Sequence, residues 1–280
     1  MYNCKPRLTR YGTVKNNRAP FWDADAEGTE VAMAGDLVSL RMLLVAAARP
    51  DRELWRHGAA QASIPVDFLA EDAVSAGNTL ARGGVDICII DAELPDAYKA
   101  AMLTVARKVK PSPLVFVSSP PGGRRFDGVD GMLPKPESVD AARKVAEICI
   151  RAKIPTRVLI VDDSGTMRSI VRKILSASRF ALDIYEASEG IAALNQLRTG
   201  KFSLVFLDYN MPGFNGLETL SEIKRESPNV AVVMMTAITD SAVVDRAQAS
   251  GALAFLKKPF FPADIDVVLA RYYGFNEPLN

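Results

Sequence analysis

Five polar residues in the second half of the chain stand at or just after the ends of short apolar runs. They are Asp162 and Asp163 after VLIV, Asp208 at the end of LVFLD, Thr236 after AVVMM, and Lys258 after LAFLK. The carboxyl ends of parallel strands meet at one edge of a sheet, so we expect these residues to converge. Three carboxylates placed together raise each other's pKa values unless a cation lies among them. Oxygen ligands of this kind suit Mg²⁺, so the pattern predicts a magnesium site.

These residue types fit phosphoryl transfer, which depends mainly on positioning and on neutralising charge. Asp208 is the expected nucleophile and would form an acyl phosphate. Asp163 is expected to hold the metal directly and Asp162 to hold it through water. Lys258 would pair with one phosphoryl oxygen, and the hydroxyl of Thr236 would donate to another.

The elements that must position these side chains follow a regular order from about Thr156 onward. Apolar runs alternate with helical patterns, in which apolar residues recur as Met167, Ile170, Val171 and Ile174 do. The runs themselves do not alternate with polar residues, so the strands are buried on both faces. Five such units predict an α/β fold, a doubly wound parallel sheet with the flavodoxin-like strand order 2-1-3-4-5.

The motifs VDDSGTMR, FLDYNMPGFNG, MMTA and FLKKPF resemble the receiver family of two-component response regulators, in particular single-domain chemotaxis (CheY-like) receivers. The resemblance covers about residues 156–275. It implies that the Asn210 carbonyl ligates the metal, and that Thr236 and Phe255 are switch residues that move when Asp208 is phosphorylated. It also implies a sensor histidine kinase as the phosphate donor and a downstream protein target.

The first half of the chain repeats this pattern less completely. Three segment pairs match: VDICIID (85–91) with SLVFLD (203–208), PLVFVSS (113–119) with VAVVMMTA (230–237), and GMLPKP (131–136) with AFLKKP (254–259). Nearly constant offsets between the paired segments indicate an internal duplication.

The duplication suggests three parts of the chain. We expect a polar extension at residues 1–28, a degenerate receiver-like domain at 29–152 and an intact receiver at 153–280. Both domains would be flavodoxin-like (βα)5 units. The joint between them is short, which should limit their relative orientations.

The first half keeps only part of the predicted site. Asp91, Ser118 and Lys135 match the nucleophile, the hydroxyl and the lysine of the second half. Met132 stands where Phe255 would be the aromatic switch. The segment PPGGRRFDG lies where a fourth helix should be, and its proline and glycine residues oppose helix formation. We therefore expect a docking or dimerisation module, so a homodimer is one candidate assembly.

The first strand of this half can be aligned in two ways. In one, LLVAAA (43–48) is the strand and alanines replace the acidic pair. In the other, EVAMAGD (30–36) is the strand and Asp36 is a surviving metal ligand. We prefer the second, because it explains a helix-like stripe formed by Leu40, Leu43, Leu44 and Ala47.

Composition narrows the classes of function. The net charge is +1, so nothing in the balance favours a nucleic-acid or membrane-surface partner. Three cysteines show no metal-ligand spacing, and no apolar run is long enough to span a bilayer, so we expect a cytoplasmic protein. No DNA-binding or enzymatic output domain is recognisable. The expected function is therefore signalling through protein contacts, not catalysis. The alternative is a phosphorelay intermediate or phosphate sink that passes phosphate between histidine proteins.

Overall fold

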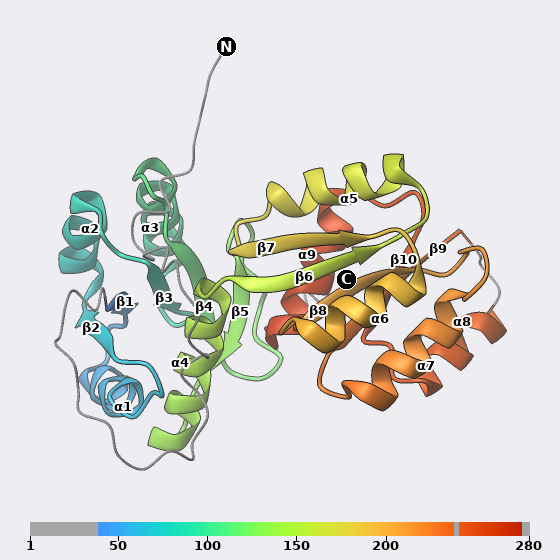
Figure 1. Ribbon diagram of the computed structural model, residues 1–280. Coiled ribbons are helices and arrows are strands. Elements are labelled where there is room, and N and C mark those ends of the chain that lie inside the picture. Colours follow the sequence, from blue (N-terminus) through green and yellow to red (C-terminus); the bar gives the residue numbers. More distant parts are fainter. Residues whose placement is uncertain (1–38, 238–240, 276–280) are drawn as a thin grey trace, which may run out of the picture.

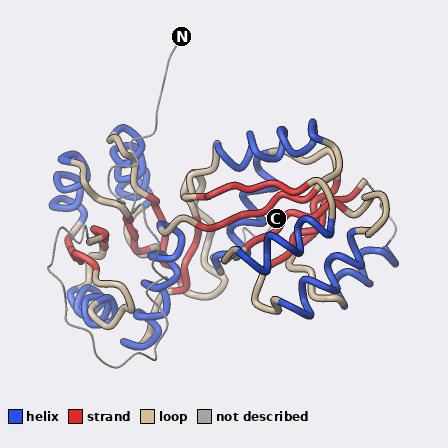
Figure 2. The backbone as a smooth tube through the Cα atoms, in the orientation of Figure 1, coloured by secondary structure: helices blue, strands red, loops and turns tan. Residues whose placement is uncertain are grey.

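Two parallel sheets, each of five strands, make up the computed structural model, which describes residues 39–237 and 241–275 (Figure 1). The strand orders are β2-β1-β3-β4-β5 and β10-β9-β8-β6-β7. Read from the β7 edge, the second order is the same as the first. Figure 2 shows the two groups of strands, one in each half of the chain. The prediction of two flavodoxin-like units with strand order 2-1-3-4-5 is confirmed.

The first half contains nine elements. They are β1 (Leu40–Val45), α1 (Arg49–Ala59), β2 (Val66–Glu71), α2 (Ala73–Arg82), β3 (Ile87–Asp91), α3 (Asp96–Lys108), β4 (Leu114–Ser119), β5 (Gly131–Pro134) and α4 (Val139–Lys153). Helices α1 and α4 cover one face of the sheet, and α2 and α3 cover the other. The chain between β4 and β5 is described throughout and has no helix, as its proline and glycine content predicted.

The second half contains ten elements. They are β6 (Thr156–Val161), α5 (Gly165–Ser176), β7 (Leu182–Ala187), α6 (Gly190–Thr199), β8 (Leu204–Asp208), α7 (Gly216–Glu226), β9 (Ala231–Thr236), α8 (Ser241–Ala249), β10 (Ala254–Lys257) and α9 (Pro262–Tyr273). Helices α5 and α9 lie on one face of the sheet, with α6, α7 and α8 on the other (Figure 1). No helix within 39–237 or 241–275 is long and apolar enough to cross a bilayer.

The preferred alignment of the first strand was wrong. Strand β1 is Leu40–Val45, and it lies inside the sheet, where it pairs with both β2 and β3. The supposed helix stripe is therefore part of a strand. A short apolar run buried on both faces has no period of its own and is easily mistaken for helix. Asp36, the expected metal ligand, and the extension at residues 1–28 lie outside the described residues.

One of the hydrophobic clusters contains buried side chains from both halves. Strand β6 begins three residues after α4 ends. A single cluster of buried side chains runs from the α1 and α4 face of the first sheet to the α5 and α9 face of the second. At its centre the ring of Phe275 packs on Phe116 of β4, and Gly131 in β5 leaves room for that ring. The short joint is therefore reinforced by direct packing.

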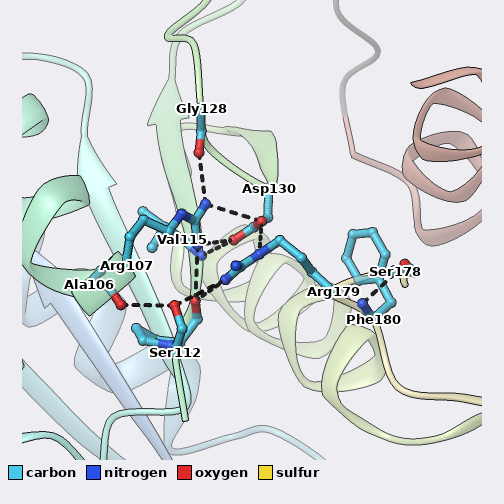
Figure 3. A network of polar contacts seen from close by, with 10 residues as sticks. Ala106, Arg107, Ser112, Val115, Gly128, Asp130, Ser178, Arg179 and Phe180 are labelled. Carbon is cyan, nitrogen blue, oxygen red and sulfur yellow. Dashed lines mark hydrogen bonds and ion pairs between the residues drawn. The ribbon is translucent and has the colours of Figure 1, made fainter. Parts of the chain in front are cut away.

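A network of ion pairs and hydrogen bonds also joins the two halves (Figure 3). The side chain of Asp130, directly before β5, is buried and accepts from Arg107 of α3 at 3.1 Å and from Arg179 of the second half at 2.5 Å. Arg179 also donates to the carbonyl of Pro113 at 2.7 Å. Asp130 and Pro113 both precede strands, so this interface lies at the amino ends of the first sheet. The carboxyl edge, where β3 and β4 end, faces away from it.

Candidate functional site

Three carboxylates gather at the carboxyl edge of the second sheet. Strands β6 and β8 are neighbours with Val161 opposite Leu207, so the residues that follow, Asp162 and Asp208, lie side by side. One oxygen each of Asp162, Asp163 and Asp208 lies within 4.8 Å of the others. Asp162 and Asp208 are buried, whereas Asp163 is exposed. The fold thus brings together the acidic residues that the sequence placed in one site.

Lys258 supplies the positive charge of this cluster. Its Nζ donates to Asp162 and to Asp208, at 2.8 Å in each case. The lysine follows β10, and its backbone N–H donates to the carbonyl of Thr236 at 2.7 Å, which extends the pairing of β10 with β9. The Lys258–Pro259 peptide is cis.

The buried and charged surroundings of the site shift the pKa values of Asp208 and Lys258. Burial raises the pKa of Asp208, and the negative charge of Asp162 adds to this, although hydrogen bonding and attraction to Lys258 oppose it. Burial alone would lower the pKa of Lys258, but its hydrogen bonds to Asp162 and Asp208 outweigh that effect and raise it. The nearby backbone N–H of Asn210 also acts to lower the pKa of Asp208. Excess negative charge in this partly buried cluster favours binding of a cation.

The predicted switch residues occupy two adjacent strands. Thr236 ends β9 and is buried; Asp208 lies opposite Met235, the residue before it. Phe255 lies in β10, is partly buried, and packs against the core that α6 and α7 cover. Thr236 thus lies at the carboxyl edge of the sheet, and Phe255 lies along the neighbouring strand.

The donor set fits a hard divalent cation. The three carboxylates offer oxygen ligands, and Asp163 is exposed on the open side of the cluster. With the carbonyl of Asn210, these groups would hold Mg²⁺ in the manner that the sequence suggested.

The first half has a second acidic cluster, which sequence reasoning described incompletely. Lys135 Nζ lies 3.1 Å from Asp91, 3.1 Å from Asp51 and 2.7 Å from Glu93. These three carboxylates also lie within 4.8 Å of one another. The acidic residues expected in this half were Asp36 and Asp91, so Asp51 and Glu93 were missed by sequence reasoning. Asp51 lies in the first turn of α1, and Glu93 stands two residues after Asp91, as Asn210 does after Asp208.

The hydroxyl of this second cluster was assigned one residue early. Lys135 N–H donates to the carbonyl of Ser119, as Lys258 N–H does to that of Thr236. Ser119 is therefore the counterpart of Thr236, while Ser118 lies directly opposite Asp91 and corresponds to Met235. A slip of one residue in a strand moves a side chain to the other face of the sheet.

Alanines stand after the first strand of the first half, where the second half has its acidic pair. Val45, the last residue of β1, lies opposite Ile90, so Ala46 and Ala47 occupy the positions of Asp162 and Asp163. Met132 occupies the position of Phe255, as expected. The first half thus has carboxylates at its edge, but they come from different elements.

Comparison with known proteins agrees with this geometry. A model of the response regulator receiver domain family matches residues 158–270. Chemotaxis protein CheY-3 of Vibrio cholerae serotype O1 is 34% identical over 119 residues, which are 42% of this chain and 91% of that protein.

Two further proteins are similar to this chain: one is a longer protein that is matched over about a third of its length, and the other is matched over both halves of this chain. The cyclic di-GMP phosphodiesterase response regulator RpfG of Xanthomonas campestris is 26% identical over 136 residues, 48% of this chain and 36% of that protein. A solved structure of a probable two-component system response regulator/GGDEF domain protein covers 84% of this chain and 98% of its own, with a TM-score of 0.52 and 21% identity. At that identity the match shows the fold alone, and its coverage includes both halves.

Proposed function

This chain belongs to the response regulator receiver family, and we propose that its second half accepts a phosphoryl group on Asp208 from a histidine kinase. One observation carries the proposal: three carboxylates and Lys258 meet at the carboxyl edge of the sheet, with Lys258 2.8 Å from both Asp162 and Asp208. That edge is where doubly wound sheets bind their ligands.

The proposed chemistry is a transfer between two nucleophiles. A carboxylate oxygen of Asp208 attacks the phosphorus of a phosphohistidine, a phosphorus–oxygen bond forms, and the phosphorus–nitrogen bond breaks. The electron pair stays on the ring nitrogen, which takes up a proton. Mg²⁺ held by Asp162, Asp163, Asp208 and the Asn210 carbonyl would neutralise charge on the phosphoryl oxygens. Lys258 would leave Asp208 for one of those oxygens, and the Thr236 hydroxyl would donate to another.

We further propose that the output is a protein–protein contact. Thr236 and Phe255 would change position when Asp208 is phosphorylated, and a downstream protein would bind the altered surface. The first half is proposed as a docking or dimerisation module, since Ala46 and Ala47 replace its acidic pair. Rapid return of phosphate to a histidine protein would instead indicate the phosphorelay or phosphate-sink alternative.

The decisive test is labelling with acetyl phosphate or a cognate kinase, resolved on a Phos-tag gel. We expect a shifted band only with Mg²⁺, and essentially none for Asp208→Asn. Asp183→Asn, an exposed aspartate of β7, is the matched control and should label as the wild type does. Full labelling of Asp208→Asn, or equal labelling in excess EDTA, would refute the assignment.

A further inference from the structure

Arg168, in α5, holds the backbone turn that carries the acidic pair. Its Nη1 donates to the carbonyl of Asp162 at 2.7 Å and to that of Asp163 at 3.3 Å. These contacts are to the peptide groups and not to the carboxylates, so the arginine leaves the carboxylate oxygens free. It acts on the direction in which the two side chains leave the turn.

Of the two acidic residues, Asp163 depends most on this support. The carboxylate of Asp162 is already fixed, because it accepts from the Ser164 N–H at 2.9 Å and from Lys258 at 2.8 Å. In the described part of the chain the exposed Asp163 carboxylate has no hydrogen-bonding partner. Its position therefore follows from its own peptide group, which Arg168 contacts. Mg²⁺ tolerates little deviation from octahedral geometry, so small errors in this position weaken binding.

Arg168 is itself held in place by an ion pair with Glu186. Its Nε lies 3.1 Å from Glu186 in β7, and the second oxygen of Glu186 accepts from Nε of Arg172. Arg172 shares the carboxylate but has no contact with the turn in the described structure. The two arginines therefore differ in one respect that matters here, which makes Arg172 a matched control.

The first half contains the same arrangement, an arginine that donates to two successive backbone carbonyls (the arginine clamp), but without the acidic pair. Arg52 in α1 donates through Nη1 to the carbonyls of Ala46 and Ala47, at 2.8 and 3.0 Å. Arg52 stands six residues after Ala46, as Arg168 does after Asp162. Because the contact persists where alanines replace aspartates, it does not depend on attraction to the carboxylates. It is a device that sets the geometry of the turn after the first strand.

We propose that Arg168 is a positioning residue for the metal site, and that through the carbonyls of Asp162 and Asp163 it sets the affinity for Mg²⁺. This inference rests on the proposed function of the site. Groups that orient metal ligands without touching the metal typically change metal affinity by about 10- to 100-fold when removed. We expect the change in Mg²⁺ affinity on losing the arginine clamp to lie at the lower end of that range, because Asp162 keeps its two other contacts.

The test uses the full chain and Mg²⁺ itself, titrated by calorimetry, together with the rate of labelling by acetyl phosphate. Arg168→Met keeps the apolar stem of the side chain and removes its donors. We expect its Kd for Mg²⁺ to rise about 10-fold. At saturating Mg²⁺ its labelling rate should return to within about 3-fold of wild type, because the nucleophile and Lys258 are untouched. Arg172→Met should bind Mg²⁺ as the wild type does, and Arg168→Lys should recover part of the loss.

Three outcomes would overturn the inference. They are an unchanged Kd in Arg168→Met, an equal rise in both methionine variants, and a labelling defect that saturating Mg²⁺ does not repair. If Arg168→Met does not fold, Glu186→Gln leaves the arginine in place but loosens it. A Kd equal to wild type in that variant would also count against the role. A wild-type chain that neither binds Mg²⁺ nor takes up phosphate is a separate result, because it would refute the proposed function itself.

Discussion

The ring of Phe275 lies 4.8 Å, centroid to centroid, from the ring of Phe116, and this pair joins the two halves of the chain. Both side chains are buried, and Phe275 also stacks on neighbouring aromatic rings of the second half. The pair belongs to a hydrophobic cluster that draws on both sheets. The two halves therefore have interdependent stabilities.

Replacing Phe275 by alanine should destabilise both halves together. Removing a buried phenylalanine typically costs about 3–5 kcal/mol in the free energy of unfolding. We expect a loss of this order and a single unfolding transition, measured by urea denaturation. Tryptophan fluorescence of a Trp22→Phe background follows the first half through Trp55, and near-ultraviolet dichroism follows both halves. Phe261→Ala, at a residue 66% exposed, is the control and should change little. Two separate transitions, with only the later one shifted, would contradict a shared core.

Asp130 should be intolerant of replacement by a residue without charge. Its carboxylate is buried between the partly exposed Arg107 and Arg179, and it also accepts from the Val115 N–H at 2.7 Å. Removing it leaves two guanidinium groups and a backbone N–H without their shared acceptor, and an unmade bond of this kind costs about 1–3 kcal/mol. Asp130→Ala should lower the urea midpoint strongly, whereas Asp127→Ala, at an exposed carboxylate nearby, should not. Similar midpoints for the two variants would show that the network contributes little.

Asp208→Asn should stabilise the metal-free protein at neutral pH. The pKa of Asp208 is raised by burial and by Asp162, so its ionised form is less favourable in the folded than in the unfolded chain. Its contribution to stability is therefore greatest below the ordinary pKa of aspartate, about 4, and is lost as pH rises through the raised value. The midpoint difference between variant and wild type should be positive at pH 7 in EDTA and should shrink towards pH 4.

Mg²⁺ should reverse that difference, because it binds the folded wild type and adds stability by mass action. Thermal unfolding in EDTA and in Mg²⁺, across this pH range, measures both effects. A variant less stable than wild type at pH 7 without metal would show that the bond to Lys258 outweighs the burial of the charge.

Lys258→Ala should impair phosphorylation far more than metal binding. Losing a positive group that meets the phosphoryl oxygens typically costs about 100-fold or more in rate. Mg²⁺ affinity should not fall, since the lysine competes with the cation for Asp162 and Asp208. Tyr209→Trp, beside the nucleophile, provides a fluorescence reporter for the Mg²⁺ titration. Abolished Mg²⁺ binding in the alanine variant would show that Lys258 organises the metal site.

Asp91→Asn should change neither kinase-dependent labelling nor oligomeric state appreciably. Carboxylates are present around Asp91, but Lys135 is bound to all three of them, and alanines replace the acidic pair. Met132 stands at the switch position, and no helix lies between β4 and β5. Phosphorylation of Asp91 would therefore have no second conformation of this half to stabilise. Mass spectrometry that identified Asp91 as the main phosphorylated residue would reverse the ranking of the two halves.

The sequence was sufficient for the second half because its local signals agree. Buried strands, helical stripes and chemically distinctive residues at the strand ends all indicated the same sheet, and the order of strands then placed Asp162, Asp208 and Lys258 together. The first half lacked such markers at its first strand. Leu40–Val45 is apolar on both faces, so periodicity could not separate strand from helix, and no acidic pair marked its end.

Three other features could not be found by matching motifs. Asp51 approaches Asp91 from a helix, at a position where the second half has Met167, so no motif comparison would pair them. Arg168 acts through backbone carbonyls, which have no sequence signature. The interface between the halves depends on Phe116 and Asp130 of the first half and on Phe275, which is far from both in the chain, and all three are ordinary in type.

The amino ends of the first sheet carry the shared hydrophobic cluster, and its carboxyl ends carry the cluster of Asp51, Asp91, Glu93 and Lys135. The two features lie at opposite ends of the same strands. Without the first half, the second half would expose the ring of Phe275 and its aromatic neighbours to water. The first half therefore serves as a hydrophobic cover for the second half, whatever chemistry its own carboxyl ends perform.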